Sequence, residues 1–256
     1  MTRLRHVVVP LVVATMAATP VTAGPSADGC ERSGANVQIT LSSTGVARLG
    51  PGGAFEVFLN GVQQDCEGAT NESTQFVDVL GTGQRDRFLI DQNGTGGRFR
   101  VEVIWRVDLG EGNDLIQLRG TPKADRYNIG TWQVGNTLVD VIDTDGDGTP
   151  NIDLFGTERM MRLQSGGNDV VSGMPKPGTN RSTGSGATMG PARIPLTLKG
   201  GPGKDRLTGG NAGDLLVGGA KDDTLKGGKG KDTLKGGGGN DRCKGGPGKD
   251  KERGCE

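Results

Sequence analysis

From Gly200 onward the chain runs in nine-residue blocks whose register is kept almost to the last residue. Each block opens with Gly-Gly, and the eighth place is Leu in four blocks, then Cys243 and Glu252. The sixth place is always an aspartate: Asp205, Asp214, Asp223, Asp232, Asp241 and Asp250. A fixed period of this kind builds an array in which each unit contacts only its neighbours. The end of the chain is therefore expected to be a solenoid.

Each block combines a short strand with a turn. Its last three residues alternate polar, apolar and polar, which predicts an extended segment with the eighth side chain inward. Its first six residues are rich in glycine, which permits a tight turn and lets backbone carbonyls approach an ion closely. Calcium takes about six to eight oxygen ligands from carboxylates and carbonyls. Two stacked turns, each with one aspartate, can provide such a set.

The pattern G-G-x-G-x-D-x-U-x resembles the RTX, or haemolysin-type, calcium-binding repeat. The resemblance implies an all-β fold, a parallel β-roll over residues 194–256, with Ca²⁺ held by the six aspartates. Because a few Leu side chains cannot offset the entropy of ordering so much glycine, the roll is expected to need calcium to fold. A disordered linker would not keep Asp and Leu in register, and collagen needs Gly at every third residue. Ala212, Lys221 and Glu252 depart from the pattern.

The chain begins with features of an export signal. Arg3 and Arg5 precede a short apolar run, and small residues end at Ala23, so residues 1–23 are expected to be removed and the protein secreted to the extracellular space. Further on, no stretch is long and apolar enough to span a membrane. Four cysteines suit an oxidising compartment and allow three pairings. We expect the pairing that brackets each end, Cys30–Cys66 and Cys243–Cys255.

Before residue 194 the sequence predicts β-strands and degenerate copies of the nine-residue repeat. Asn60-Gly61 after an apolar run is a hairpin signal. Asp114 and Asp169 lie in Gly-rich turns two places before an apolar residue, so they are calcium candidates, although ordinary turns would look the same. The expected organisation is a signal peptide, a strand segment, a degenerate β-coil, a Gly/Pro/Ser/Thr-rich loop and the roll: 1–23, 24–80, 81–172, 173–193 and 194–256.

One acidic loop does not follow the repeat. Asp143, Asp145 and Asp147 have the D-x-D-x-D-G spacing with which an EF-hand-type calcium loop begins. The twelfth place, where that loop carries a bidentate Glu, is Leu154. The stretch is therefore compatible either with a calcium site on a β scaffold or with an Asp-Gly turn that binds no metal.

The functional expectation follows from what the chain lacks. Its only histidine, His6, lies in the export signal, which removes Ser-His and Cys-His catalysis and His-ligated zinc. With its Gly254-Cys255-Glu256 ending, the chain resembles small secreted calcium-binding proteins of high-GC Gram-positive bacteria, which implies a non-enzymatic calcium binder. We expect no nucleic-acid partner.

Two other functions stay open. Residues 199–256 carry 13 Lys and Arg against 9 Asp and Glu, so an adhesion module binding anionic cell-wall polymer or polysaccharide is one alternative. A calcium-dependent enzyme acting on polysaccharide through paired carboxylates is the other.

Overall fold

A computed structural model describes residues 28–100, 102–134, 137–145, 150–155, 157, 159–161, 166–174 and 189–256. The predicted signal peptide and most of the predicted loop lie outside these ranges. The described residues are built from β-strands and one 3-10 turn, Pro51–Gly53, so the all-β prediction is confirmed. Among them, no helix is long and apolar enough to cross a membrane.

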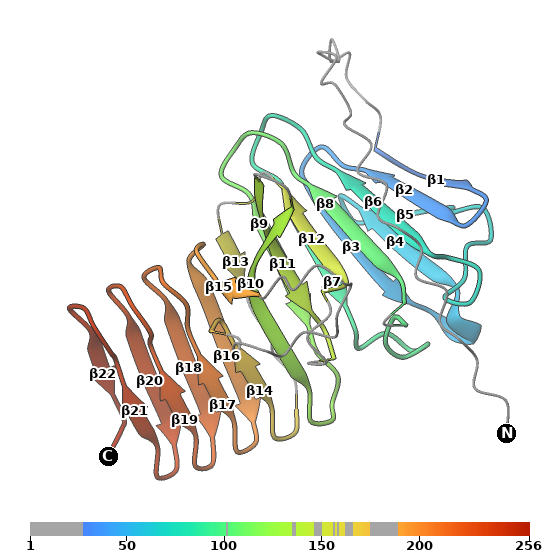
Figure 1. Ribbon diagram of the computed structural model, residues 1–256. Helices are drawn as coiled ribbons and strands as arrows, with labels where there is room; N and C mark the ends of the chain where they lie inside the picture. Colours follow the sequence, from blue (N-terminus) through green and yellow to red (C-terminus); the bar gives the residue numbers. More distant parts are fainter. Residues whose placement is uncertain are drawn as a thin grey trace, which may run out of the picture.

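The strands form two sheets that face each other along the whole molecule (Figure 1). In spatial order, sheet 1 contains β1 (Gly29–Ser33), β2 (Asn36–Thr40), β6 (Phe76–Leu80), β8 (Ile104–Asp108), β12 (Ile152–Phe155), β11 (Thr137–Asp143), β10 (Arg126–Val134), β14 (Val170–Ser172), β17 (Arg206–Thr208), β19 (Thr224–Lys226) and β21 (Arg242–Lys244), with β15 (Gly190–Pro191) also on β10. Sheet 2 contains β22 (Lys251–Arg253), β20 (Thr233–Gly238), β18 (Leu215–Ala220), β16 (Leu196–Pro202), β13 (Arg159–Met161), β9 (Leu115–Arg119), β7 (Arg87–Asp91), β3 (Thr44–Leu49), β4 (Phe55–Leu59) and β5 (Val62–Gln64).

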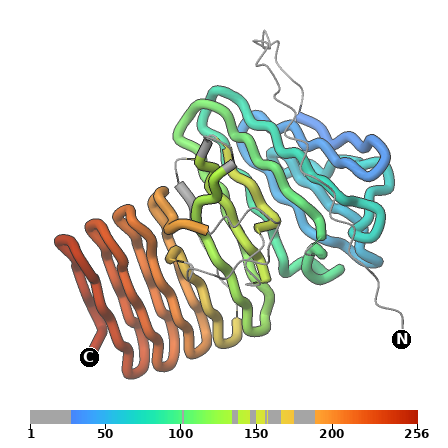
Figure 2. Tube along the Cα trace, viewed as in Figure 1, coloured from blue at the N-terminus to red at the C-terminus, as the bar shows by residue number. Residues whose placement is uncertain are grey.

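The C-terminal coils are regular because the nine-residue block is half a coil. Successive blocks alternate between the sheets, and each strand pairs in parallel with the strand two blocks away (Figure 2). Leu225 lies between Leu207 and Cys243 in sheet 1, while Leu216 lies beside Leu234 in sheet 2. These leucines are at most 1% exposed, as the alternation predicts. Glu252 takes the inward place of the last block and is exposed.

The core widens toward the N-terminal end. Aromatic residues from several coils meet there, with the rings of Phe99 and Trp105 4.8 Å apart and those of Phe55 and Phe99 5.0 Å apart. The predicted hairpin is present between β4 and β5, where Asn60 and Gly61 both have positive φ. This half of the molecule therefore has an aromatic core, whereas the narrow C-terminal coils are filled by leucines.

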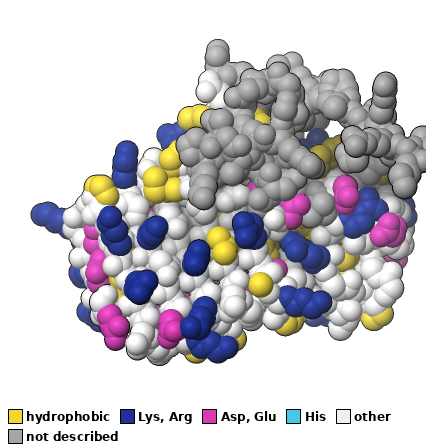
Figure 3. Space-filling view, turned by 60° about the horizontal axis from the view of Figure 1, so that its bottom comes forward, with side chains coloured by type: hydrophobic (Ala, Val, Ile, Leu, Met, Phe, Trp, Pro, Cys, Tyr) yellow, Lys and Arg dark blue, Asp and Glu magenta, His cyan; other side chains and the backbone are white. Residues whose placement is uncertain are grey.

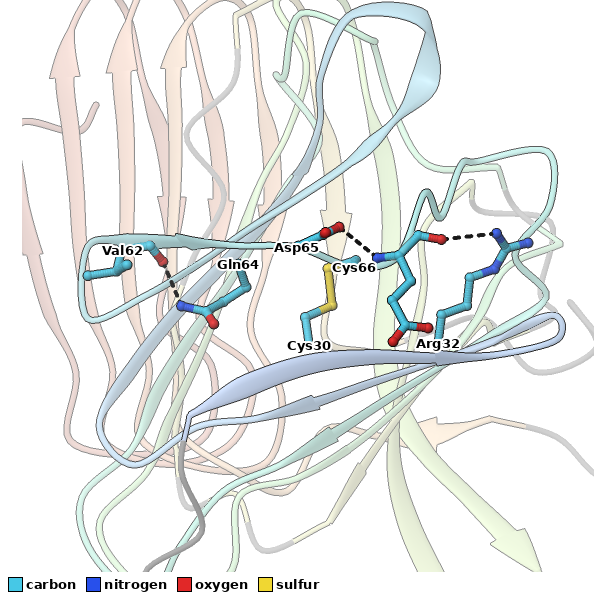
Figure 4. The surroundings of a disulfide bond; sticks show 7 residues. Cys30, Arg32, Val62, Gln64, Asp65 and Cys66 are labelled. Atoms are coloured by element: carbon cyan, nitrogen blue, oxygen red, sulfur yellow. Dashed lines mark hydrogen bonds between the residues drawn. A yellow bond between two sulfur atoms is a disulfide. The ribbon is translucent and has the colours of Figure 1, made fainter.

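Both predicted disulfides are present, and they occupy equivalent places at the two ends. Cys30 in β1, the edge strand of sheet 1, is bonded to Cys66, which follows β5 at the edge of sheet 2 (Figure 4). Cys243 in β21 is bonded to Cys255, which follows β22. Each disulfide thus joins one sheet to the other at an open end of the coil stack.

Candidate metal centre

The six repeat aspartates form two columns along the edges of the roll. Each one directly precedes a strand, so alternate blocks place their aspartates at opposite edges. The column at sheet 1 contains Asp205, Asp223 and Asp241, and the column at sheet 2 contains Asp214, Asp232 and Asp250. All but Asp250 are buried, with at most 3% of the residue exposed.

Hydrogen bonds link the members of each column. The backbone N–H of Asp205 donates to Oδ1 of Asp223, and that of Asp223 donates to Oδ1 of Asp241, both at 2.8 Å. At the other edge Asp214 donates to Asp232 at 2.8 Å, and Asp232 donates to Asp250 at 3.0 Å. One carboxylate oxygen of each acceptor therefore fixes the spacing of successive turns.

The second carboxylate oxygen is left for another partner. Oδ2 of four aspartates is buried and accepts no hydrogen bond: Asp205, Asp223, Asp232 and Asp241. Asp214 differs, because its Oδ2 accepts the Gly210 N–H at 2.6 Å. Burial of a charged oxygen without a donor is costly. A cation in the turn would remove that cost.

Desolvation changes the acidity of these groups. Burial raises the pKa of Asp214 to about 6, against hydrogen bonds from the Leu196 and Gly210 amides that lower it. Burial likewise raises the pKa of Asp223 to about 6, and the neighbouring Asp205 and Asp241 charges add to the effect. The pKa values of Asp205 and Asp232 are raised by burial as well. Stacked, desolvated carboxylates favour either protonation or a bound cation.

The first glycine of each block allows oxygens to converge in the turn. A Cβ on Gly218 would overlap Asp223 Oδ2 and would lie 2.6 Å from the Gly236 carbonyl oxygen of the next coil. A Cβ on Gly200 would lie 2.7 Å from the Gly218 carbonyl oxygen. In the third block, Lys221 replaces the fourth-place glycine and has φ of 75°, a conformation that favours glycine. The departure noted in the sequence therefore lies at a strained position.

Carboxylate and carbonyl oxygens are the ligands of a hard cation such as calcium. Within the described ranges, no three His, Cys, Asp or Glu side chains gather as a metal site. The turns offer one repeat aspartate each with backbone carbonyls close by, such as that of Gly236 beside Asp223 Oδ2. The donor-free Oδ2 atoms and the glycine-lined turns thus fit Ca²⁺.

The same hydrogen bonds continue into the irregular coils before residue 194. Asp125 donates its N–H to Asp169 Oδ1 at 2.8 Å, and Asp169 donates to Asp205 Oδ1 at 2.7 Å. At the other edge Asp86 donates to Asp114 Oδ1 at 2.7 Å. The candidate Asp169 therefore belongs to the sheet 1 column, together with Asp125. The candidate Asp114 forms the same link with Asp86, but this pair is separate from the sheet 2 column, where Asp214 Oδ1 accepts the Leu196 N–H. Asp86 and Asp125 share the Asp-x-apolar signal but were not among the predicted ligands.

The acidic loop is only partly described. Asp143 is buried; its Oδ2 accepts Asn128 Nδ2–H at 2.9 Å, and its Oδ1 accepts the Asp145 N–H at 3.2 Å. Asp147 lies outside the described residues. Metal binding by this loop stays a prediction.

A stack of parallel half-coils with aspartate and glycine turns at both edges defines a calcium-binding β-roll. Residues 197–220 and 217–251 match the RTX calcium-binding nonapeptide repeat in four copies, and repeats of this family bind Ca²⁺. The C-terminal part of this protein is therefore an RTX-type calcium-binding roll. No curated protein and no solved structure matches the chain.

Proposed function

We propose that this is a secreted, non-enzymatic calcium-binding protein whose C-terminal roll folds on binding Ca²⁺. The supporting observation is the set of buried Oδ2 atoms without donors in the two columns. Without a cation, these carboxylates repel one another across stacked turns. Low calcium inside the cell would keep the roll unfolded during export, and calcium outside would then fold it.

Outside the roll, burial raises the pKa of three carboxyl groups, and two of them, Asp140 and Asp153, lie on adjacent strands and bear on the enzymatic alternative. Burial raises the pKa of Asp153 to about 6, against the opposing Arg106 charge, and burial also raises that of Asp140. In the strand register, Asp153 lies opposite the exposed Arg106, so its side chain is on the outer face of sheet 1. Asp140 lies opposite the core residue Leu154, so its side chain is on the inner face. Because the two carboxyls face opposite sides of sheet 1, they do not form the facing pair that glycoside hydrolysis needs.

Circular dichroism tests the proposal on the chain from residue 24. In chelator we expect a spectrum with a large disordered component, and in millimolar calcium, the concentration range of extracellular modules at about 10⁻⁴–10⁻³ M, a gain of β signal. Magnesium at the same concentration is the control, because it is smaller and dehydrates reluctantly. A circular dichroism spectrum and a melting temperature that do not change on addition of calcium would overturn the proposal.

A second candidate function, binding of an anionic polymer, is favoured by the surface charge. Outward places on the roll strands carry Lys and Arg, and in Figure 3 basic side chains are spread widely over the face drawn. Calcium bound at the edges would make the roll more cationic still.

A further inference from the structure

The outer face of sheet 1 in the roll carries cations and no acids. Its outward side chains are those at the seventh and ninth places of alternate blocks: Arg206, Thr208, Thr224, Lys226, Arg242 and Lys244. Among the described residues, none of the four basic side chains forms an ion pair. The face therefore offers unpaired positive charge on a rigid parallel ladder.

An open groove of about 660 Å³ borders this face along the calcium edge. The strands contribute Arg206, Thr224 and Arg242, and the turns contribute the side chains of Asn168 and Asn240. Asp205 and Asp223, which line the same groove, are candidate calcium ligands. Glu256 also lines it.

One further acid in the groove already has a partner. Asp222 Oδ2 lies 2.6 Å from Lys204 Nζ, and its Oδ1 accepts the Asn240 N–H at 3.2 Å. Once calcium neutralises Asp205 and Asp223, the groove has two arginines against one remaining acid, Glu256, because Asp222 is paired with Lys204.

The two arginines are held at a fixed separation. Arg206 pairs with Thr224, and Thr224 pairs with Arg242, so the arginines lie two strands apart with a hydroxyl between them. At a strand spacing of about 4.8 Å, their backbones are about 9.6 Å apart. This separation is comparable with the length of a disaccharide unit in an extended glycan.

We propose that this groove binds a linear polysaccharide that carries carboxylate groups, an inference that rests on the proposed calcium-induced folding of the roll. Each guanidinium pairs with one carboxylate in a two-pronged hydrogen bond, and the Thr224 hydroxyl and the Asn168 and Asn240 amides contact sugar hydroxyls. Residues 189–256 contain no aromatic side chain, so they offer no stacking platform for the bases of a single-stranded nucleic acid. Charge and hydrogen bonding therefore select an acidic sugar chain.

The test uses the chain from residue 24 and hyaluronate oligosaccharides, which have one carboxylate per disaccharide. Calorimetry in saturating calcium compares the wild type with Arg206→Gln/Arg242→Gln. A matched control is Lys199→Gln/Lys235→Gln, which removes the same charge from exposed sites two strands apart on sheet 2. We expect roughly tenfold or greater loss of affinity for the arginine variant and less than about twofold loss for the lysine variant, because only the former removes charge-assisted pairs.

Other outcomes overturn the inference. They are equal losses in both variants, binding that persists in chelator, equal binding of neutral dextran, or tighter binding of single-stranded DNA. The calcium-induced β signal is recorded for every variant. If that signal is present while hyaluronate does not bind, the glycan inference fails and the calcium function stands. If the signal is absent from the wild type, the calcium function itself fails.

Discussion

The backbone N–H of Asp223 donates a 2.8 Å hydrogen bond to Oδ1 of Asp241, eighteen residues further along the chain. The bond leaves Oδ2 of Asp241 buried without a donor. One side chain therefore sets the distance between two coils with one oxygen and presents the other to the turn. Loss of the carboxylate should affect both coil stacking and metal binding.

Asp232 should contribute more to calcium binding than Asp250. Asp232 accepts from the coil before it and donates to the coil after it, whereas Asp250 lies in the last block and is partly exposed. We expect Asp232→Ala to reduce calcium affinity or cooperativity by a larger factor than Asp250→Ala, measured by calorimetry. Equal losses would show that the end coil is as well formed as the centre.

The roll should respond to pH in opposite directions with and without calcium. The ordinary aspartate pKa of 3.8 is raised to about 6 in Asp214 and Asp223 by burial. Without calcium, the folded roll binds more protons than the unfolded chain between these values. That stability is complete below about pH 3.8 and is lost as the pH rises through about 6.

We therefore expect the chain in chelator to show a larger β signal at pH 4.5 than at pH 7.5. In calcium the order reverses, since protons compete with the metal for the same oxygens, so the midpoint calcium concentration should be higher at pH 5 than at pH 7.5. Asp223→Asn should weaken both trends. Stability in chelator that rises with pH across this window would contradict the assignment.

Gly218 should tolerate no side chain. A Cβ there would overlap Asp223 Oδ2 and the Gly236 carbonyl, so Gly218→Ala is expected to destabilise the calcium-bound roll by about 1–3 kcal/mol, as overpacking does. Gly238→Ala is the matched control, because a Cβ at Gly238 meets nothing within 4 Å. Thermal denaturation in saturating calcium measures both. A similar drop in melting temperature for the two variants would argue against a crowded turn at Gly218.

The C-terminal disulfide should lower the calcium requirement without supplying a ligand. It closes a loop with a sequence separation of 12 between Cys243 and Cys255, for which chain entropy predicts a stabilisation on the order of 3 kcal/mol. The Cys243→Ser/Cys255→Ser variant should still fold in calcium but at a higher midpoint, because more ligand must offset the lost stability. Cys30→Ser/Cys66→Ser, at the other end, should leave that midpoint nearly unchanged. A variant that no longer binds calcium at any concentration would mean that the bridge shapes the site itself.

The sequence predicts the regular coils because every constraint there recurs at a constant period. Leu216 and Leu234 face the core and Asp205 and Asp223 share an edge, as the nine-residue block requires. The disulfides and the Asn60-Gly61 hairpin also depend on local or end-to-end patterns, and both are confirmed.

The aspartate links before residue 194 could not be predicted in the same way. The linked aspartates there are 28 residues apart for Asp86 and Asp114, 44 for Asp125 and Asp169, and 36 for Asp169 and Asp205. Insertions between coils lengthen the sequence between two linked aspartates, although the aspartates remain hydrogen-bonded neighbours in the structure. The order of antiparallel strands such as β10, β11 and β12 likewise depends on packing over the core, which the repeat pattern does not encode.

The alternation of blocks between the two sheets also limits how such an array can change in length. Removal of one nine-residue block would send every later strand to the opposite sheet, so Arg242 would leave the groove and Asp241 would leave its column. Removal or duplication of two blocks, eighteen residues, would preserve every partner relationship downstream. Insertions and deletions that preserve the aspartate columns and the groove must therefore add or remove complete turns of the coil. Proteins built this way should differ from one another by even numbers of nine-residue blocks.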